Sequence, residues 1–292
     1  MRYFVANGET DCLGPGTRVG RRGDFAVLSD GTTHYELAGP GDGPVFVFVP
    51  GLTIPLDFWD DVTAVLHGRG FRTLAYSAYG RGYSDRVRGR YGRPLFVRQL
   101  DDLVRRLDLS DVHVVGSSMG ALIALAYAAS PSGRVASLTV SGPAGLSAER
   151  NPIALLPDPL TPPAGKHLLR RNLLAHLGRN VDSPAEAERL RTLVLDGFRF
   201  EGSMYALTST LKHFPFTGQD ALFDTSAVDL PPTMLIWGAN DRVTPAIAFG
   251  RAAELLNPVR AEHIPDCGHM ASFERPRQFA DLLTTFVTEL PT

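Results

Sequence analysis

The segment at residues 45–49 limits more than any other what this chain can fold into, because it reads Val-Phe-Val-Phe-Val. An unbroken apolar run of β-branched and aromatic residues predicts a strand that is buried on both faces. Further strands are expected at 72–76, 112–115, 135–140, 233–237 and 261–264. Helical segments separate them at 56–67, 94–107, 120–129, about 245–256 and 272–289. This alternation predicts an α/β fold, with a mostly parallel central sheet and helices on both faces.

Two departures from this alternation divide the chain. Residues 24–29 and 32–37 predict a β-hairpin around Asp30-Gly31, and the Gly-rich residues 1–23 before it form an extension whose order the sequence leaves open. Residues 146–228 instead read as helices and proline-rich loops. We therefore expect an α/β core over 24–145 and 229–292, with a helical cap over 146–228.

Within the expected cap, one amphipathic helix is predicted over residues 166–177. Its leucines stand on one side at 168, 169, 173, 174 and 177, and Arg170 and Arg171 stand on the other. The apolar side of such a helix packs against other apolar groups of the protein or its ligand. We expect Leu169, Leu173, Phe198 and Phe200 to bind the substrate.

Composition excludes several classes of partner. The 292 residues carry a net charge of −2, so no basic surplus favours nucleic acid or an anionic membrane. No apolar stretch approaches the roughly 18 residues of a membrane span, and the N-terminus lacks the apolar run of a signal peptide. Cys12 and Cys267 have no metal-binding spacing; free thiols are expected, with a disulfide as the alternative. We expect a cytoplasmic protein without metal or cofactor, in an oligomeric state that the sequence leaves open.

The segment Gly116-Ser117-Ser118-Met119-Gly120 lies between a predicted buried strand and a predicted helix. In that context G-x-S-x-G predicts a nucleophile elbow, a strained turn that exposes the serine hydroxyl. The next amide, that of Met119, is then one donor of an oxyanion hole. The alternative is a plain glycine-serine turn. We expect Ser118 to be the nucleophile.

A serine nucleophile requires a base and an acid that orients it. Asp241 follows the strand at 233–237, and His269 follows the strand at 261–264 in a Gly-containing loop. The other possible acid, Asp266, is too close to His269 in the same loop to be preferred. The remaining histidines are interpreted as packing or surface residues: His34, His67, His113, His167, His176, His213 and His263.

The second oxyanion donor is expected in the loop after residues 45–49. Pro50 has no N–H, so Gly51 is expected to turn the chain and Leu52 to donate its amide toward Ser118. A simple turn that ends the strand is the alternative.

Together these motifs resemble the α/β-hydrolase superfamily from about residue 24 onward. Residues 49–59 resemble the family's oxyanion loop and its tryptophan, and residues 79–85 resemble its glycine-rich segment. Residues 237–245 resemble its acid loop, and residues 268–276 its histidine loop. Pro50 and Ser117 replace histidines that are common there, and Ser77 replaces a common aspartate. Epoxide hydrolases and dehalogenases of this fold use an aspartate nucleophile, so Ser118 argues against them.

The resemblance implies a carboxylesterase, lipase-like enzyme or lactone hydrolase that acts on a small ester or lactone through an acyl-Ser118 intermediate. A carbon–carbon bond hydrolase of a dienoic diketo acid is the first alternative, because the Gly-Xaa-Ser-Met elbow and the cap resemble such enzymes. Those enzymes usually have an aromatic residue after the catalytic histidine, where this chain has Met270. A receptor of the same fold with slow turnover is the second alternative.

Overall fold

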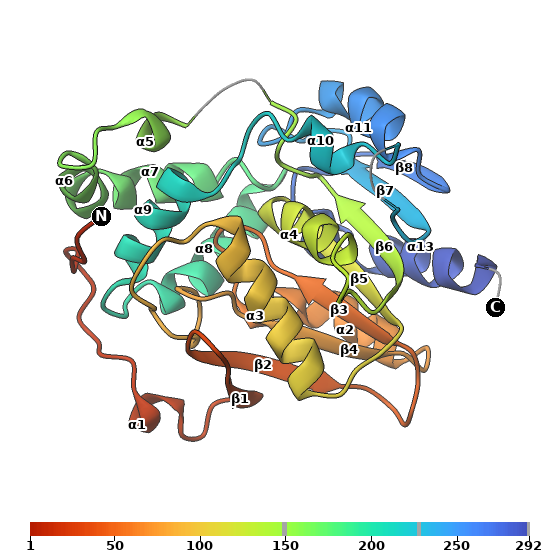
Figure 1. The fold of residues 1–292 in the computed structure, drawn as a ribbon, viewed down its shortest axis with the longest axis horizontal. Helices are drawn as coiled ribbons and strands as arrows, with labels where there is room; N and C mark the ends of the chain where they lie inside the picture. Colours follow the sequence, from red (N-terminus) through yellow and green to blue (C-terminus); the bar gives the residue numbers. More distant parts are fainter. Residues whose placement is uncertain (148–150, 227–228, 291–292) are drawn as a thin grey trace.

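The computed structural model describes residues 1–147, 151–226 and 229–290. Its described strands form one sheet in the order β1-β2-β4-β3-β5-β6-β7-β8 (Figure 1). Their bounds are β1 Asp24–Val27, β2 Thr32–Ala38, β3 Val45–Val49, β4 Arg72–Tyr76, β5 Val112–Ser117, β6 Val135–Ser141, β7 Thr233–Gly238 and β8 Arg260–Ile264. Strand β2 pairs antiparallel with β1 on one side and with β4 on the other. The pairs β4–β3, β3–β5, β5–β6, β6–β7 and β7–β8 are parallel. The predicted α/β fold with a mostly parallel sheet is confirmed.

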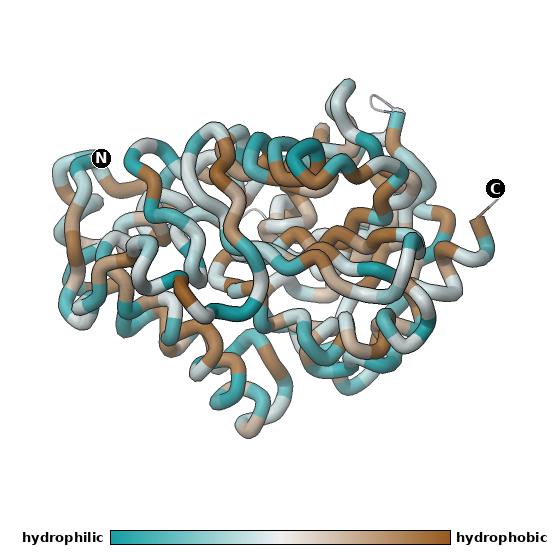
Figure 2. Tube along the Cα trace, turned by 90° about the horizontal axis from the view of Figure 1, so that it is seen from below, coloured by the Kyte–Doolittle hydropathy of each residue, from teal (hydrophilic) through white to brown (hydrophobic). Residues whose placement is uncertain are grey.

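Strand β3 shows why the sheet is covered on both sides. Its valines belong to a cluster with apolar side chains of α3 (Arg93–Arg106), α4 (Met119–Ala128) and α11 (Phe249–Leu256). Its phenylalanines belong to a second cluster with η1 (Leu56–Trp59), α2 (Asp60–His67) and α13 (Pro276–Glu289). Successive side chains of a strand point to opposite faces, so one short apolar run contributes to two cores. Figure 2 accordingly shows apolar stretches of chain through the middle of the molecule.

Two of the expected helices are interrupted near their N-termini. The segment at 245–256 begins as the 3₁₀ turn η2 (Ala246–Ala248) before α11. The closing segment divides at Arg275 into α12 (Ala271–Glu274) and α13, where Pro276 begins the second helix. Proline fits the first position of a helix because its missing N–H has no partner there in any case.

Between β6 and β7 the described chain is helical; the first five of these helices gather at one end of the sheet, whereas the last one packs near α4 and α11 (Figure 1). They are α5 Pro152–Leu155, α6 Thr161–His167, α7 Leu169–Leu177, α8 Pro184–Gly197, α9 Ser203–His213 and α10 Asp220–Phe223. The single helix expected over 166–177 is wrong, because it breaks at Leu168. That side chain is 64% exposed, whereas Leu169 and Leu173 are buried. The expected end of the insertion, Val228, lies outside the described residues.

The N-terminal extension is ordered and lies along the insertion. Asp11 forms a β-bridge with Phe200, and the carboxylate of Glu9 accepts hydrogen bonds from the amides of Gly202 and Met204 at the start of α9. A short helix, α1 (Pro15–Arg18), then leads to β1. In the described ranges, no helix is both long and apolar enough to cross a membrane.

Candidate active site

The turn between β5 and α4 places Ser118 in a strained conformation. Its φ of 56° and ψ of −116° lie in a region that non-glycine residues rarely adopt. The flanking glycines are needed for close approach: a Cβ on Gly116 would lie 2.6 Å from the oxygen of Gly120, and one on Gly120 would lie 2.1 Å from the oxygen of Val49. The structure therefore has the sharp strand-to-helix turn that the pattern predicts.

His269 and Asp241 form a buried pair. The Nδ1 of His269 lies 2.7 Å from Oδ2 of Asp241, and their side chains are 1% and 0% exposed. The amides of Val243 and Thr244 each donate to Oδ1 of Asp241 at 2.8 Å, and the Thr244 hydroxyl donates to Oδ2 at 2.8 Å. Burial raises the pKa of the Asp241 carboxyl, but the charge of His269 and these hydrogen bonds outweigh it, so the pKa lies below its ordinary value. Asp241 is therefore an anion whose contact with Nδ1 fixes the orientation of the imidazole ring.

Gly142 makes room for this pair. It follows β6 with a φ of 47°, and a Cβ there would lie 3.2 Å from Oδ2 of Asp241 and 3.3 Å from Nδ1 of His269. Gly142 was not among the site residues predicted from the sequence. Its signal was a glycine directly after a buried strand at the carboxyl edge of the sheet.

The other possible acid, Asp266, does not contact His269. It is exposed, on a turn where its φ is 48°, and its carbonyl oxygen accepts a hydrogen bond from Arg275. Of the two carboxylates, only Asp241 pairs with the histidine.

The loop after β3 passes beside Ser118. A Cβ on Gly51 would lie 3.4 Å from the oxygen of Ser117 and 3.5 Å from Cβ of Ser118, and Leu52 lines the same cavity as Ser118. Gly51 is not among the glycines with a positive φ, and its expected role in turning the chain remains a prediction. Met119 is the first residue of α4, where a helical amide has no partner within the helix. The oxyanion roles of Leu52 and Met119 remain predictions.

Ser118 opens on a cavity of about 400 Å³ between the sheet and the insertion. Thr244, which also lines it, has its hydroxyl 3.2 Å from Nδ1 of His269, so the acid–histidine pair adjoins this cavity. A second lobe of about 330 Å³ shares Leu52, His176 and Arg179 with the first. The second lobe is walled mainly by apolar side chains: Ile153, Leu169, Leu173, Leu207 and Leu211.

The four expected substrate-binding residues therefore separate into two pairs. Leu169 and Leu173 line the second lobe. Phe198 and Phe200 line neither lobe; Phe200 stacks edge-on against Tyr83, with ring centroids 5.3 Å apart. Phe198 and Phe200 are 2% and 0% exposed and pack within the protein, which does not favour the contact with substrate that was predicted for them.

His176 and Arg179 line both lobes and were not among the site residues predicted from the sequence. Burial, followed by the positive charges of His269 and Arg179, lowers the pKa of His176 to about 4, so its imidazole is neutral at pH 7. Arg179 lies two residues beyond the end of α7 at Leu177, so helical spacing could not have placed it beside His176, and no local pattern marked either residue. His176 had been interpreted as a filler.

The described residues contain no group of three or more His, Cys, Asp or Glu side chains placed to hold a metal ion. Cys12 and Cys267 are both free, one exposed and one buried, so the disulfide alternative is wrong.

Comparison with known proteins gives relatives over most of the chain. A curated 2-hydroxy-6-oxo-6-(2'-aminophenyl)hexa-2,4-dienoic acid hydrolase from Metapseudomonas resinovorans is 25% identical, over 88% of this chain and 87% of its own. A 2-hydroxy-6-oxononadienedioate/2-hydroxy-6-oxononatrienedioate hydrolase from Pseudomonas putida is 26% identical, over 90% and 96%. Among solved structures, the enol-lactonase from Burkholderia xenovorans LB400 has the same fold, with a TM-score of 0.75, 21% identity and coverage of 91% and 100%. The model of the family described as alpha/beta hydrolase fold matches residues 44–276, and this chain, a hydrolase, belongs to that family.

Proposed function

We propose that this chain cleaves a small-molecule substrate through an acyl-Ser118 intermediate, with His269 as the base and Asp241 as its orienting acid. The observation that carries the proposal is the buried 2.7 Å contact of His269 and Asp241 beside the cavity that Ser118 lines. Each of these residues follows a strand end at the carboxyl edge of the parallel sheet, where ligands of such sheets bind.

The chemistry follows from this arrangement. His269 takes the proton of the Ser118 hydroxyl as its oxygen attacks a carbonyl carbon, and Asp241 stabilises the imidazolium that forms. The amides of Leu52 and Met119 stabilise the oxyanion. The leaving group takes the proton from His269, and a water molecule then hydrolyses the acyl-serine by the same sequence of steps.

For the bond that breaks, we propose a carbon–carbon bond next to the keto group of a 2-hydroxy-6-oxo-dienoic acid. The named activities of the two curated relatives, which are 25% and 26% identical to this chain, support this choice. The cavity supports it independently: the cation of Arg179 and the neutral His176 provide hydrogen-bond donors for a carboxylate or an enol, and the apolar lobe provides room for the other end of the molecule.

Ester or lactone cleavage is the second candidate. Met270 after His269 favours it, since carbon–carbon hydrolases of this fold usually have an aromatic residue there. Both bonds can be cleaved by acyl transfer to Ser118, but the carbon–carbon bond needs one step more: the 2-hydroxy group first ketonises, its proton going to C5, so that the 2-oxo group stabilises the electron pair of the broken bond before it is protonated.

The test is a substrate panel with three arms: a 2-hydroxy-6-oxo-dienoic acid, p-nitrophenyl esters of increasing acyl length, and a fluorophosphonate probe that labels activated serines. We expect Ser118 to be labelled and the dienoic acid to have the highest kcat/KM. Faster turnover of an ester would assign the chain to the esterases. Labelling without turnover of any substrate would favour a receptor, and an active Ser118→Ala variant would refute the triad.

A further inference from the structure

Arg81 is a buried cation without a carboxylate partner. Its residue is 1% exposed, and none of the ion pairs among the described residues includes it. Burial lowers the pKa of its guanidinium to about 10, so it still carries its charge at neutral pH. Burying an unpaired charge costs free energy unless hydrogen bonds compensate for it. The groups that accept hydrogen bonds from Arg81 therefore indicate the role of its buried guanidinium.

These acceptors belong to separate parts of the fold. The Nε of Arg81 donates to the carbonyl oxygen of Leu52 at 2.6 Å, and Nη2 donates to the hydroxyl of Thr210 at 3.0 Å. A longer bond of 3.3 Å joins Nη1 to the oxygen of Tyr79. Leu52 is in the loop beside Ser118, whereas Thr210 is in α9 of the insertion. One side chain thus connects the active-site loop to the insertion.

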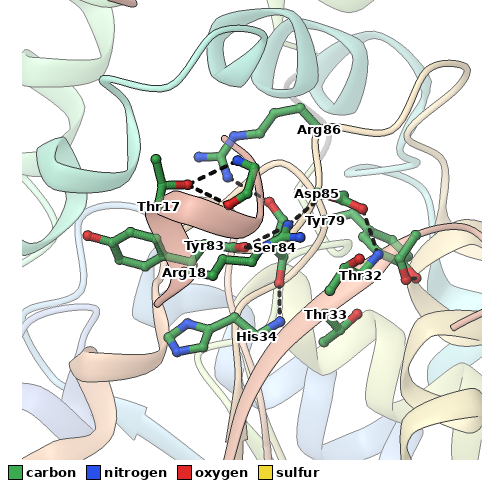
Figure 3. A network of polar contacts seen from close by, with 12 residues as sticks. Thr17, Arg18, Thr32, Thr33, His34, Tyr79, Tyr83, Ser84, Asp85 and Arg86 are labelled. Carbon is green, nitrogen blue, oxygen red and sulfur yellow. Dashed lines mark hydrogen bonds and ion pairs between the residues drawn. The ribbon is translucent and has the colours of Figure 1, made fainter. Parts of the chain in front are cut away.

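The backbone of Arg81 is itself held in place. It lies between Gly80 and Gly82, whose φ angles are 82° and 47° and where a Cβ would lie 2.3 Å from Ala206 and 2.4 Å from the Ser77 hydroxyl. Figure 3 shows how the following residues are anchored to β2: the amide of Thr32 donates to Asp85 at 2.7 Å, and that of His34 donates to the Ser84 hydroxyl at 2.9 Å. Arg81 therefore extends from a fixed base.

We propose that Arg81 is a positioning residue for the oxyanion hole. By holding the carbonyl of Leu52 it fixes the orientation of that residue, so that the Leu52 amide faces the oxyanion formed at Ser118. Through Thr210, this orientation depends on α9 being in place. The inference rests on the proposed function, because it assigns the donor role to Leu52.

A second arginine of the same segment provides a control. Arg86 is partly buried, less so than Arg81, and burial lowers its pKa to about 10. It donates to the carbonyl oxygens of Gly82, Ser84 and Gly197 and to the Ser203 hydroxyl, none of which is in the loop after β3. A purely structural role for buried arginines here predicts that loss of Arg86 and loss of Arg81 have the same kinetic effect.

The experiment compares Arg81→Met, Arg81→Lys and Arg86→Met in the full chain. We expect Arg81→Met to lower kcat about 10²-fold, as for loss of an oxyanion donor, with KM changed less than about threefold. It should also weaken an aryl trifluoromethyl ketone, which forms a tetrahedral oxyanion on serine, by a similar factor. Arg81→Lys should recover part of kcat, since one ammonium donor can reach Leu52. Equal kcat losses in Arg81→Met and Arg86→Met, in proportion to the fall in Tm, would overturn the proposal.

If Arg81→Met does not fold, two less disruptive substitutions in α9 test the same proposal. Thr210 and Thr208 are both buried in α9, and each donates its hydroxyl to the carbonyl four residues earlier. Only Thr210 contacts Arg81. We expect Thr210→Val to lower kcat about threefold to tenfold and Thr208→Val to leave it within about twofold. Equal values would overturn the proposal.

Failure of this inference is distinguishable from failure of the proposed function. If Ser118→Ala is active, the triad is wrong whatever Arg81 does. If Ser118→Ala is inactive while Arg81→Met keeps its kcat and its affinity for the ketone, only the role of Arg81 is wrong.

Discussion

Nδ1 of His269 lies 2.7 Å from Oδ2 of Asp241 in a position closed to solvent, whereas Asp266, three residues before the histidine, is exposed. Proximity in sequence would have favoured Asp266. The parallel sheet instead brings Asp241 to the histidine from the end of the neighbouring strand, since β7 and β8 are paired in register from Met234–Arg260 to Gly238–Ile264.

We predict that Asp241→Asn keeps the fold and lowers kcat about 10²- to 10⁴-fold. An asparagine amide donates where the carboxylate accepted, so the imidazole takes the wrong tautomer and its cation loses a stabilising charge. Steady-state kinetics and thermal unfolding of the variant give the two quantities. Asp266→Asn is the matched control and should keep wild-type kcat; the reverse pattern would identify Asp266 as the acid.

We predict that Leu173→Ala changes the ratio of kcat/KM between short and long acyl substrates by about tenfold, or roughly 1.4 kcal/mol, because this side chain lines the second lobe. Phe200→Ala should leave that ratio unchanged and reduce the free energy of unfolding by roughly 3–5 kcal/mol, because its ring is fully buried away from the cavity. Kinetics on a graded ester panel and urea unfolding separate the two effects. A uniform loss of activity in Leu173→Ala would mean that it only stabilises the insertion.

His113 should make the stability of the protein depend on pH. Burial lowers the pKa of this imidazole to about 4, and its Nδ1 lies 2.9 Å from the Ser137 hydroxyl. Between pH 6.5 and 4 the unfolded chain therefore binds a proton that the folded chain does not, so stability falls as the pH falls through this range. The contribution is of the order of 3 kcal/mol.

The measurement is the free energy of unfolding at several pH values for the wild type and His113→Gln, which cannot titrate. The variant should be less stable at pH 7 and should lose less stability on acidification. Parallel curves for the two proteins would contradict this prediction.

The strands and the contact of His269 with Asp241 were accessible from the sequence because their signals are local. Apolar runs such as Val45–Val49 define buried strands, and residues at the ends of parallel strands meet at one edge of the sheet. Glycines at 116 and 120 marked the sharp turn at Ser118, and the close contacts that a Cβ would make there explain why.

What the sequence did not reveal depends on tertiary packing. The periodicity of leucines could not show that the chain breaks at Leu168, or that Phe200 packs on Tyr83 rather than facing the cavity. A single histidine in a helix, such as His176, has no local mark that separates a cavity wall from a filler. Nor does composition show that Glu9 anchors the extension to α9, because that contact joins residues almost 200 positions apart.

The last prediction concerns Arg179, which should distinguish substrates by charge. It lines both lobes, and charge-assisted hydrogen bonds to a carboxylate contribute about 1.5–3 kcal/mol. Arg179→Gln should therefore lower kcat/KM for a 2-hydroxy-6-oxo-dienoic acid roughly 10- to 100-fold, and change that for a neutral p-nitrophenyl ester less than about threefold. Arg179 and Arg242 are both exposed, but Arg242 lines neither lobe, so Arg242→Gln removes the same charge and should affect both substrates little. Equal losses on the acid and the ester in Arg179→Gln would mean that the guanidinium shapes the cavity without recognising an anion, and would remove the main physical support for an acidic substrate.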